Sequence, residues 1–232
     1  MVLPAPLTTP VAARESFDPV YSPPSAAPSS RTLYCVVKRT LDLIVASSML
    51  LFLLPVLAGA VIAVIITSPG PIFFVQERCG QGRTVIGCRK LRTMVVNAEG
   101  CLSADGDLAR QWGANCKLQD DPRVTPVGRI LRATSLDELP QLLNVISGDM
   151  SMVGPRPVPH HELELMYGPH AAEVRSVKPG LTGLWQVSGR SATTYEKRVQ
   201  LDLEYVRTQS LRGDLAIMAK TPRAVLTRRG AV

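Results

Sequence analysis

Two adjacent carboxylates, Asp137 and Glu138, lie in an arginine-rich stretch that runs from residue 121 to residue 157. The basic residues near them are Arg123, Arg129, Arg132 and Arg156. An aspartate can attack phosphorus to form an acyl phosphate, which divides one difficult transfer into two easier steps. Arginine binds phosphate oxygens at two points, and a divalent cation screens a carboxylate from an anionic substrate. This combination of residues is therefore suited to phosphoryl transfer.

The same acids also fit a structural pattern. Residues 135–138 read S-x-x-E, the capping box in which a serine and a glutamate satisfy each other's backbone amides at a helix start. In that arrangement Asp137 would complement the positive end of the helix dipole. The residues alone leave both roles open, and capping is the more common role of the pattern.

A long apolar segment precedes these acids. Residues 43–67 contain no charged side chain, and this run is longer than the roughly 20 residues that cross a bilayer. A cleavable signal peptide is one interpretation, because Lys38 and Arg39 precede the run and Ala58-Gly59-Ala60 resembles a cleavage site. The long polar tail before the segment argues against a signal peptide.

An ordinary spanning helix is the second interpretation of this segment, and a bent, re-entrant helix is the third. Pro55 interrupts the run, and proline removes a backbone hydrogen bond and bends a helix. Basic residues also flank both ends, whereas a single span should show an asymmetry of charge. These flanking residues are Arg31, Lys38, Arg39, Arg78, Arg83, Arg89, Lys90 and Arg92. The sequence features support the spanning helix and the re-entrant helix about equally.

The composition fits one globular body with attachments, because the chain has 232 residues and is 46% hydrophobic. A net charge of +7 favours partners that carry phosphate: a nucleic acid, an anionic membrane or a phosphorylated substrate. The five cysteines form no C-x-x-C pair, so we expect reduced thiols rather than disulfides or a zinc site. We assign no role to the three histidines, His160, His161 and His170.

The remaining sequence predicts a mainly helical chain with a small β-hairpin. Residues 1 to about 30 have the composition of a disordered tail. The apolar runs 72–75 and 84–86 predict the hairpin, placed before the segment 90–94. Helices are expected at the start of 95–119, and at 136–146, 159–167 and 194–209. The basic amphipathic segment 211–226 either lies on an anionic membrane or packs on the domain.

The stretch SLDELPQLLNVISGDMSMVGPRP, at 135–157, resembles the signature of the bacterial sugar transferases, also called monotopic phosphoglycosyl transferases. The resemblance extends from Tyr34 to the C-terminus. The supporting matches are KRTLD at 38–42, SPGPIFF at 68–74, QERCGQG at 76–82, KLRTM at 90–94 and VKPGLTGLWQVSGR at 177–190. Departures from the family pattern are Leu91 in place of phenylalanine and Leu54 in place of serine.

The resemblance implies an architecture and a location. It divides the chain into a disordered tail (1–33), a re-entrant membrane helix (34–67) and a cytosolic catalytic domain (68–232). The fold class is mainly α with a small β-hairpin, and interfacial amphipathic helices surround a compact catalytic domain. The expected location is the cytoplasmic face of a bacterial inner membrane, with the lipid bilayer as a partner and no nucleic acid. A homodimer is left open.

The resemblance also implies a reaction. Hexose-1-phosphate, with galactose or glucose preferred, passes from a UDP-sugar to undecaprenyl phosphate, and UMP is released. The reaction uses Mg²⁺ and a covalent phosphosugar-aspartate intermediate, and it is the first membrane step of exopolysaccharide synthesis.

The family motif assigns residues to these steps. Asp137 is the expected nucleophile, and Glu138 supports the metal or handles a proton. Phosphate contacts are expected from Lys90, Arg92 and Arg132, and the nucleotide end of the pocket from Pro155, Arg156 and Pro157.

Two alternative functions remain open. A glycosyltransferase would pass the sugar without its phosphate and release a nucleoside diphosphate. A non-catalytic, membrane-tethered recruitment protein would release no nucleotide. The identity of the released nucleotide therefore separates the three hypotheses.

Overall fold

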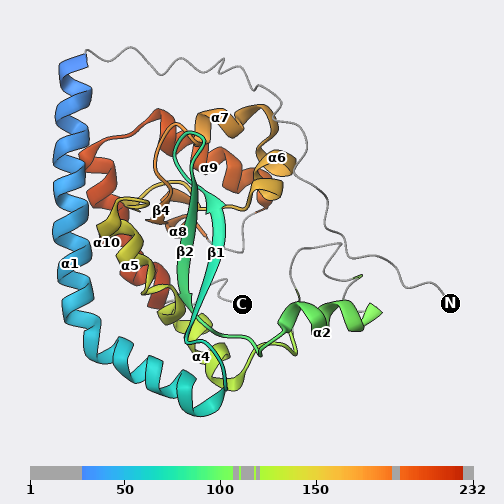
Figure 1. Ribbon diagram of the computed structural model, residues 1–232. Helices are drawn as coiled ribbons and strands as arrows, with labels where there is room; N and C mark the ends of the chain where they lie inside the picture. The colour runs from blue at the N-terminus through green and yellow to red at the C-terminus, as the bar shows by residue number, and fades with distance from the viewer. Residues whose placement is uncertain (1–27, 107–109, 111–117, 119–120, 190–193, 227–232) are drawn as a thin grey trace.

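One long helix runs along one side of a body formed by the rest of the described chain (Figure 1). The C-terminal end of this helix turns beneath that body (Figure 1). The structure is a computed structural model that describes residues 28–106, 110, 118, 121–189 and 194–226. Most of the predicted tail (1–33) lies outside these residues. The described chain is mainly helical with a small two-stranded hairpin, as the sequence predicted.

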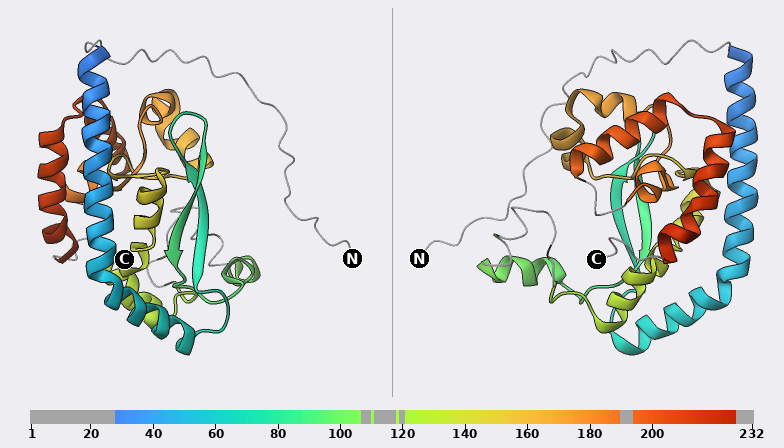
Figure 2. Two further views of the ribbon diagram at one scale, coloured as in Figure 1. Left: turned by 60° about the vertical axis from the view of Figure 1, so that its left-hand side comes forward. Right: turned by 180° about the vertical axis from the view of Figure 1, so that it is seen from behind.

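The long helix, α1 (Pro28–Thr67), contains Pro55 in its second half. Its segment Thr32–Thr67 is long and apolar enough to cross a membrane by length and composition. Both views in Figure 2 show α1 bent rather than straight, which agrees with a proline that cannot donate a helix hydrogen bond. Large apolar side chains lie exposed along it, at Leu51, Phe52, Leu54, Val56, Ile62, Ile65 and Ile66.

Strands β1 (Phe73–Cys79) and β2 (Val85–Leu91) form the antiparallel hairpin. It is longer than the sequence predicted, so Lys90 belongs to β2 rather than to the segment after the hairpin. In this register Arg78 faces Ile86 and Gln76 faces Cys88. Because opposed residues share one face and alternate residues along a strand do too, Arg78, Cys88 and Lys90 lie on the same face.

A second, smaller sheet was not predicted. Strands β3 (Ser151–Val153) and β4 (Gly180–Thr182) pair in parallel. A Cβ atom at Gly180 would lie 2.1 Å from the backbone nitrogen of Gly154. Only glycine permits this close approach of two backbones, which brings the Pro155–Pro157 turn beside β4.

The helices that surround the strands are short, and their bounds are α2 (Ala98–Ala104), α4 (Pro126–Thr134), η1 (Leu136–Glu138), α5 (Gln141–Ser147), α6 (His160–Tyr167), η2 (Gly168–His170), α7 (Ala171–Val174), α8 (Leu184–Val187), α9 (Tyr195–Arg207) and α10 (Leu211–Leu226). The predictions at 159–167 and 194–209 correspond to α6 and α9. The single helix predicted at 136–146 is wrong, because Pro140 separates the 3-10 turn η1 from α5 and proline interrupts the helix hydrogen-bond ladder.

Polar contacts fix the first half of α1 to the body. Lys38 Nζ lies 3.0 Å from Asp214 Oδ2 on α10. Arg39 donates to the carbonyls of Val145 and Ile146, at 2.6 and 2.9 Å, where the last turn of α5 leaves carbonyls unpaired within the helix. Helix α10 therefore packs on the domain and α1, as one of the two interpretations of segment 211–226 expected.

Apolar contacts fix the second half of α1. Ala60 and Val64 are buried in one cluster with Leu91 of β2 and Leu131 of α4. Both halves of the long helix therefore contact the same body, and the distal half reaches the strand and the helix that flank the carboxylates.

Candidate active site

The chain turns sharply just before the two carboxylates. Ser135 has φ 58° and ψ 18°, a left-handed conformation, and its backbone N–H donates to the Arg132 carbonyl at 3.1 Å. It therefore ends α4 and directly precedes the 3-10 turn η1, and its side chain makes no capping hydrogen bond. The capping-box interpretation of residues 135–138 is thus wrong. Asp137 and Glu138 instead occupy a single 3-10 turn between α4 and α5.

Asp137 is nearly buried, with 7% of its surface exposed. Burial, followed by the neighbouring charge of Glu138, raises the pKa of the Asp137 carboxyl to about 6, while Lys90 and Arg132 act in the opposite direction. Loss of hydration disfavours the charged form of a carboxylate. Two basic side chains thus offset part of the burial effect, and the carboxylate is the predominant form above about pH 6.

Glu138 is more exposed and pairs directly with Lys90. The Lys90 Nζ atom lies 2.7 Å from Glu138 Oε1, which joins β2 to η1. The Lys90 and Glu138 side chains are 25% and 37% exposed. This ion pair therefore stands at the surface edge of the site, while Asp137 lies deeper.

Arg132 approaches the acids from the last turn of α4. Its Nε donates to Thr93 Oγ1 at 2.8 Å. Burial lowers the pKa of Arg132, and the charge of Asp137 is the largest factor that opposes this shift. The structure thus places Lys90 and Arg132 in the electrostatic surroundings of Asp137, on strand β2 and helix α4 respectively.

Arg92 occupies a different place from the other predicted phosphate-binding residues. Its guanidinium is buried under the loop after α1, where Nη2 donates to the carbonyl of Ser68. A Cβ atom at Gly70 would collide with Arg92 Nη1. Arg92 therefore ties the end of α1 to the segment after β2, and it does not line the cleft described next.

A cleft lies beside the acids, between the hairpin, η1 and the β3–β4 region. It brings together four of the predicted site residues, Lys90, Glu138, Arg156 and Pro157. The other lining residues are Arg78, Cys88, Gln141, Gly180, Leu181 and Gln186. Lys90, predicted to bind phosphate, and Arg156 and Pro157, predicted to bind the nucleotide, therefore line the same cleft.

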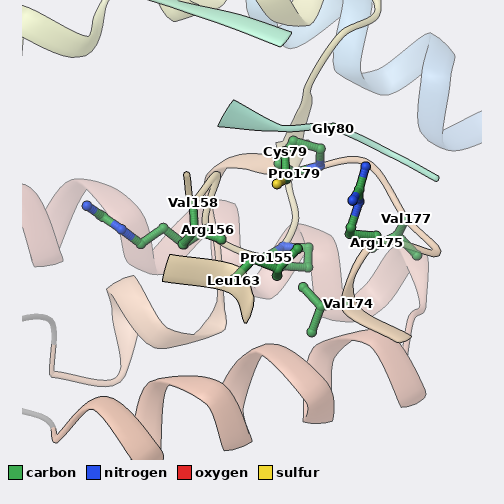
Figure 3. Close-up of a pocket in the computed structure, with 10 residues that line it drawn as sticks. All are labelled: Cys79, Gly80, Pro155, Arg156, Val158, Leu163, Val174, Arg175, Val177 and Pro179. Carbon is green, nitrogen blue, oxygen red and sulfur yellow. The ribbon is translucent and has the colours of Figure 1, made fainter. Parts of the chain in front are cut away.

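A neighbouring pocket is lined by Pro155, Arg156 and mostly apolar side chains (Figure 3). Figure 3 shows the Arg156 side chain extending away from the other labelled residues. Pro155 lines this pocket and not the cleft that holds Glu138, whereas Arg156 borders both spaces.

Sequence reasoning assigned no role to Arg78, Gln141 or Gln186 in this cleft. The signal for Arg78 was present in the hairpin pattern, because residues 78, 88 and 90 share a face in the observed register. Gln141 follows Pro140 at the start of α5, and Gln186 lies on the short helix α8. Their positions depend on tertiary packing, for which the local sequence holds no comparable signal.

The acidic pair is compatible with Mg²⁺ only if a substrate supplies further ligands. In the part of the chain that the structure describes, no group of three His, Cys, Asp or Glu side chains could hold a metal ion. Mg²⁺ in proteins commonly takes one or two carboxylates and completes its coordination with phosphate oxygens and water. Asp137 and Glu138 fit that donor set.

The site therefore combines Glu138 and several basic side chains in the cleft with the buried Asp137 beside them. This arrangement on a body tied to an apolar helix suits an enzyme that acts on phosphorylated substrates. The bacterial sugar transferase family matches residues 33–228. The chain belongs to this family and is an enzyme of its phosphoglycosyl transferase class.

Individual relatives support this assignment. The chain is 42% identical over 224 residues to exopolysaccharide production protein ExoY of Rhizobium meliloti, covering 95% of this chain and 98% of that protein. It is 40% identical over 207 residues to the UDP-glucose:undecaprenyl-phosphate glucose-1-phosphate transferase of Caulobacter vibrioides, covering 86% and 73%. It is 46% identical over 199 residues to the UDP-galactose-lipid carrier transferase of Erwinia amylovora, covering 84% of this chain but 41% of that protein.

Proposed function

We propose that the enzyme transfers a hexose-1-phosphate from a UDP-sugar to undecaprenyl phosphate and releases UMP. The observation that carries this proposal is the position of Asp137, a nearly buried carboxylate beside the cleft and within the field of Lys90 and Arg132. The relatives named as glucose-1-phosphate and galactose phosphate transferases act on substrates of this kind. Exopolysaccharide synthesis is the corresponding process.

The chemistry that we propose has two steps. An Asp137 oxygen attacks the phosphorus attached to the sugar, an O–P bond forms, and the bond to the bridging oxygen of the diphosphate breaks, so UMP departs with the electron pair. A phosphate oxygen of the lipid then attacks the same phosphorus, and the Asp137–phosphorus bond breaks. The carboxylate is regenerated, and no proton is consumed overall.

The basic residues and a divalent cation have complementary parts in this proposal. Lys90 and Arg132 offset the negative charge that gathers when a carboxylate approaches a diphosphate. Glu138 and Asp137 would hold Mg²⁺, which neutralises phosphate charge when it is bound. Lys90 also holds Glu138 in place through the 2.7 Å ion pair.

The nucleotide end is proposed to lie along the Pro155–Pro157 turn. Arg156 and Pro157 line the cleft that contains Glu138 and Lys90. Pro155 is buried and lines the neighbouring pocket. In this proposal the sugar phosphate binds near the acids and the nucleotide binds farther along the same cleft.

We also propose that α1 is re-entrant, so that the catalytic domain and both ends of α1 lie at the cytoplasmic face of the inner membrane. The contacts of Lys38 with Asp214 and of Val64 with the Leu131 cluster support this topology. A straight spanning helix would carry one of these ends to the opposite side of the bilayer. The exposed Ile130 on α4 lies next to the buried Leu131 and suits an interfacial position.

A product assay tests the proposed function. The enzyme in nanodiscs would receive undecaprenyl phosphate and either UDP-galactose or UDP-glucose, with the released nucleotide identified by chromatography. We expect UMP and a lipid-linked sugar diphosphate. Release of UDP would support transfer of the sugar alone, and the absence of any nucleotide product with a wider panel of UDP-sugars would support a recruitment protein.

A further inference from the structure

Arg156, after β3, and Arg198 of α9 lie against the ring of Trp185, and Arg78 of β1 lines the cleft beside Arg156. We call these three arginines the basic wall. The guanidinium carbons of Arg156 and Arg198 lie 5.2 and 4.9 Å from the ring centre of Trp185. Cationic groups over an indole face are attracted by its quadrupole, so Trp185 holds two like charges together.

Two acidic side chains among the described residues face the three arginines of the basic wall: Glu162 lies near Arg78, and the buried Asp202 faces Arg156 and Arg198. Three positive charges against two acids leave an excess of positive charge. Arg78 Nη1 approaches Glu162 only to 3.9 Å, and the other Glu162 oxygen accepts a hydrogen bond from Tyr195. Burial, followed by the charge of Arg156, lowers the pKa of both Arg78 and Arg198. Like charges thus raise one another's free energy here, which an added anion would relieve.

Several donors of this cluster also lack hydrogen-bond partners in the part of the chain that the structure describes. The buried Nε atoms of Arg156 and Arg198 make no hydrogen bond there, nor does the indole Nε1 of Trp185. An unpaired buried donor costs about 1–3 kcal/mol. Charge excess and unpaired donors together indicate a built site for an anion.

We infer that the basic wall binds the phosphate that departs with the nucleoside, with Arg78 and Arg156 as the contacting residues and Trp185 and Arg198 as positioning residues. This inference rests on the proposed function, and it assigns the two donor phosphates to different residues. Lys90 and Arg132 serve the phosphate that Asp137 attacks. The basic wall serves the other phosphate, since Arg78, Arg156, Lys90 and Glu138 line one cleft.

Binding of UDP, measured by calorimetry on the full chain in nanodiscs, tests the inference without requiring turnover. We expect Arg78→Ala to raise the Kd for UDP by about tenfold or more, because a two-point phosphate contact is lost. Arg78→Lys keeps the charge and should still weaken binding, because an ammonium cannot form the fork. The matched control is Arg212→Ala, which removes an exposed arginine of α10 and should leave the Kd within about twofold.

Two variants at position 185 test whether Trp185 positions the arginines. Trp185→Leu should raise the Kd for UDP, and Trp185→Phe should restore most of the affinity because phenylalanine keeps an aromatic face for Arg156. Binding of uridine, which lacks phosphate, should not change between these two variants. Equal UDP affinity in the Leu and wild-type proteins would overturn this role.

The outcomes separate the inference from the proposed function. If the wild-type enzyme releases UMP in the transfer assay but Arg78→Ala and Arg78→Lys bind UDP as tightly as wild type, the basic wall is rejected and the function stands. If UDP binding depends on Arg78 but no UMP is formed with lipid and UDP-sugars, the function is rejected and the anion site stands.

Discussion

Lys90 Nζ lies 2.7 Å from Glu138 Oε1, so strand β2 and the turn that carries Asp137 are joined by an ion pair at the edge of the cleft. Both side chains are partly exposed, and exposed ion pairs contribute about 0–1 kcal/mol to stability. The contact therefore has more to do with holding charge near Asp137 than with holding the fold together.

Replacing Lys90 with Met should separate these two effects. We expect UMP release to fall by about a hundredfold, since charge stabilisation in the transition state is lost, while the free energy of unfolding changes by less than about 1 kcal/mol. Turnover assays and denaturant melts measure the two quantities. Lys220→Met on α10 is the control, and a Lys90 variant whose activity loss only follows its loss of stability would contradict this role.

Arg132 is expected to depend on the shape of its guanidinium. Because Nε is engaged by Thr93 Oγ1 at 2.8 Å, its terminal nitrogens are oriented by that bond. Arg132→Lys should lower kcat/KM by about tenfold or more, since an ammonium cannot replace a planar fork. Thr93→Val should lower it less, because it removes only the orienting bond. An Arg132→Lys enzyme with a normal rate would make this arginine peripheral.

Asp202 on α9 should make stability depend on pH. It is fully buried, accepts a hydrogen bond from the Tyr167 hydroxyl at 2.7 Å, and faces Arg156 and Arg198. Burial raises its pKa from an ordinary 3.8 to about 7. The folded state therefore binds the Asp202 proton more tightly than the unfolded state does. The protonated Asp202 carboxyl contributes its full stabilisation of the fold below about pH 4, and this contribution is lost as the pH rises through 7.

Asp202→Asn removes that titration while keeping the shape of the side chain. Between pH 5 and pH 8 the wild-type protein should lose more stability than the Asn variant, by an amount on the order of 1–3 kcal/mol. Thermal melts across this range measure the difference. If the stability of the two proteins changed with pH in the same way, the pKa of the Asp202 carboxyl would not be raised in the folded protein.

The re-entrant topology predicts where Cys35 can be labelled. Cys35 is exposed on α1, one turn from Lys38. In a Cys101→Ser, Cys116→Ser background, a membrane-impermeant thiol reagent should label it only after spheroplasts are lysed. Adding Pro55→Ala should straighten the helix and increase labelling of intact spheroplasts. If Cys35 were labelled efficiently in intact spheroplasts in the protein that retains Pro55, the result would favour a simple spanning helix.

The sequence predicted the elements that depend on local patterns. The hairpin, α6, α9 and the apolar α1 follow from periodicity and composition, and the signature around Asp137 identified the acids. The order of matches, rather than any one residue, made the family recognisable.

The remaining features depend on backbone and tertiary geometry. Ser135 fits a capping box by spacing, but its left-handed conformation ends α4 and excludes that role. Arg92 lies in a basic motif, yet it reaches the loop after α1 because Gly70 leaves room for its guanidinium. Trp185 has no local signal for a role, because its two arginine partners come from other segments.

In the proposed mechanism, Asp137 carries the sugar phosphate between the donor and the lipid. Asp137→Asn keeps the size of the side chain but removes the nucleophile, so the variant should fold and lose turnover by orders of magnitude. Glu138→Gln is the matched control, because it should slow the reaction but still permit a covalent intermediate.

The most direct measurement is a trapping experiment without lipid acceptor. The enzyme would be mixed with a UDP-sugar labelled in the sugar phosphate, quenched in acid, digested and analysed by mass spectrometry. We predict one hexose-phosphate added to the peptide containing Asp137, with UMP released in the same amount, and no addition in Asp137→Asn. Label on another residue, or UMP release that requires donor and lipid bound together, would contradict the covalent mechanism.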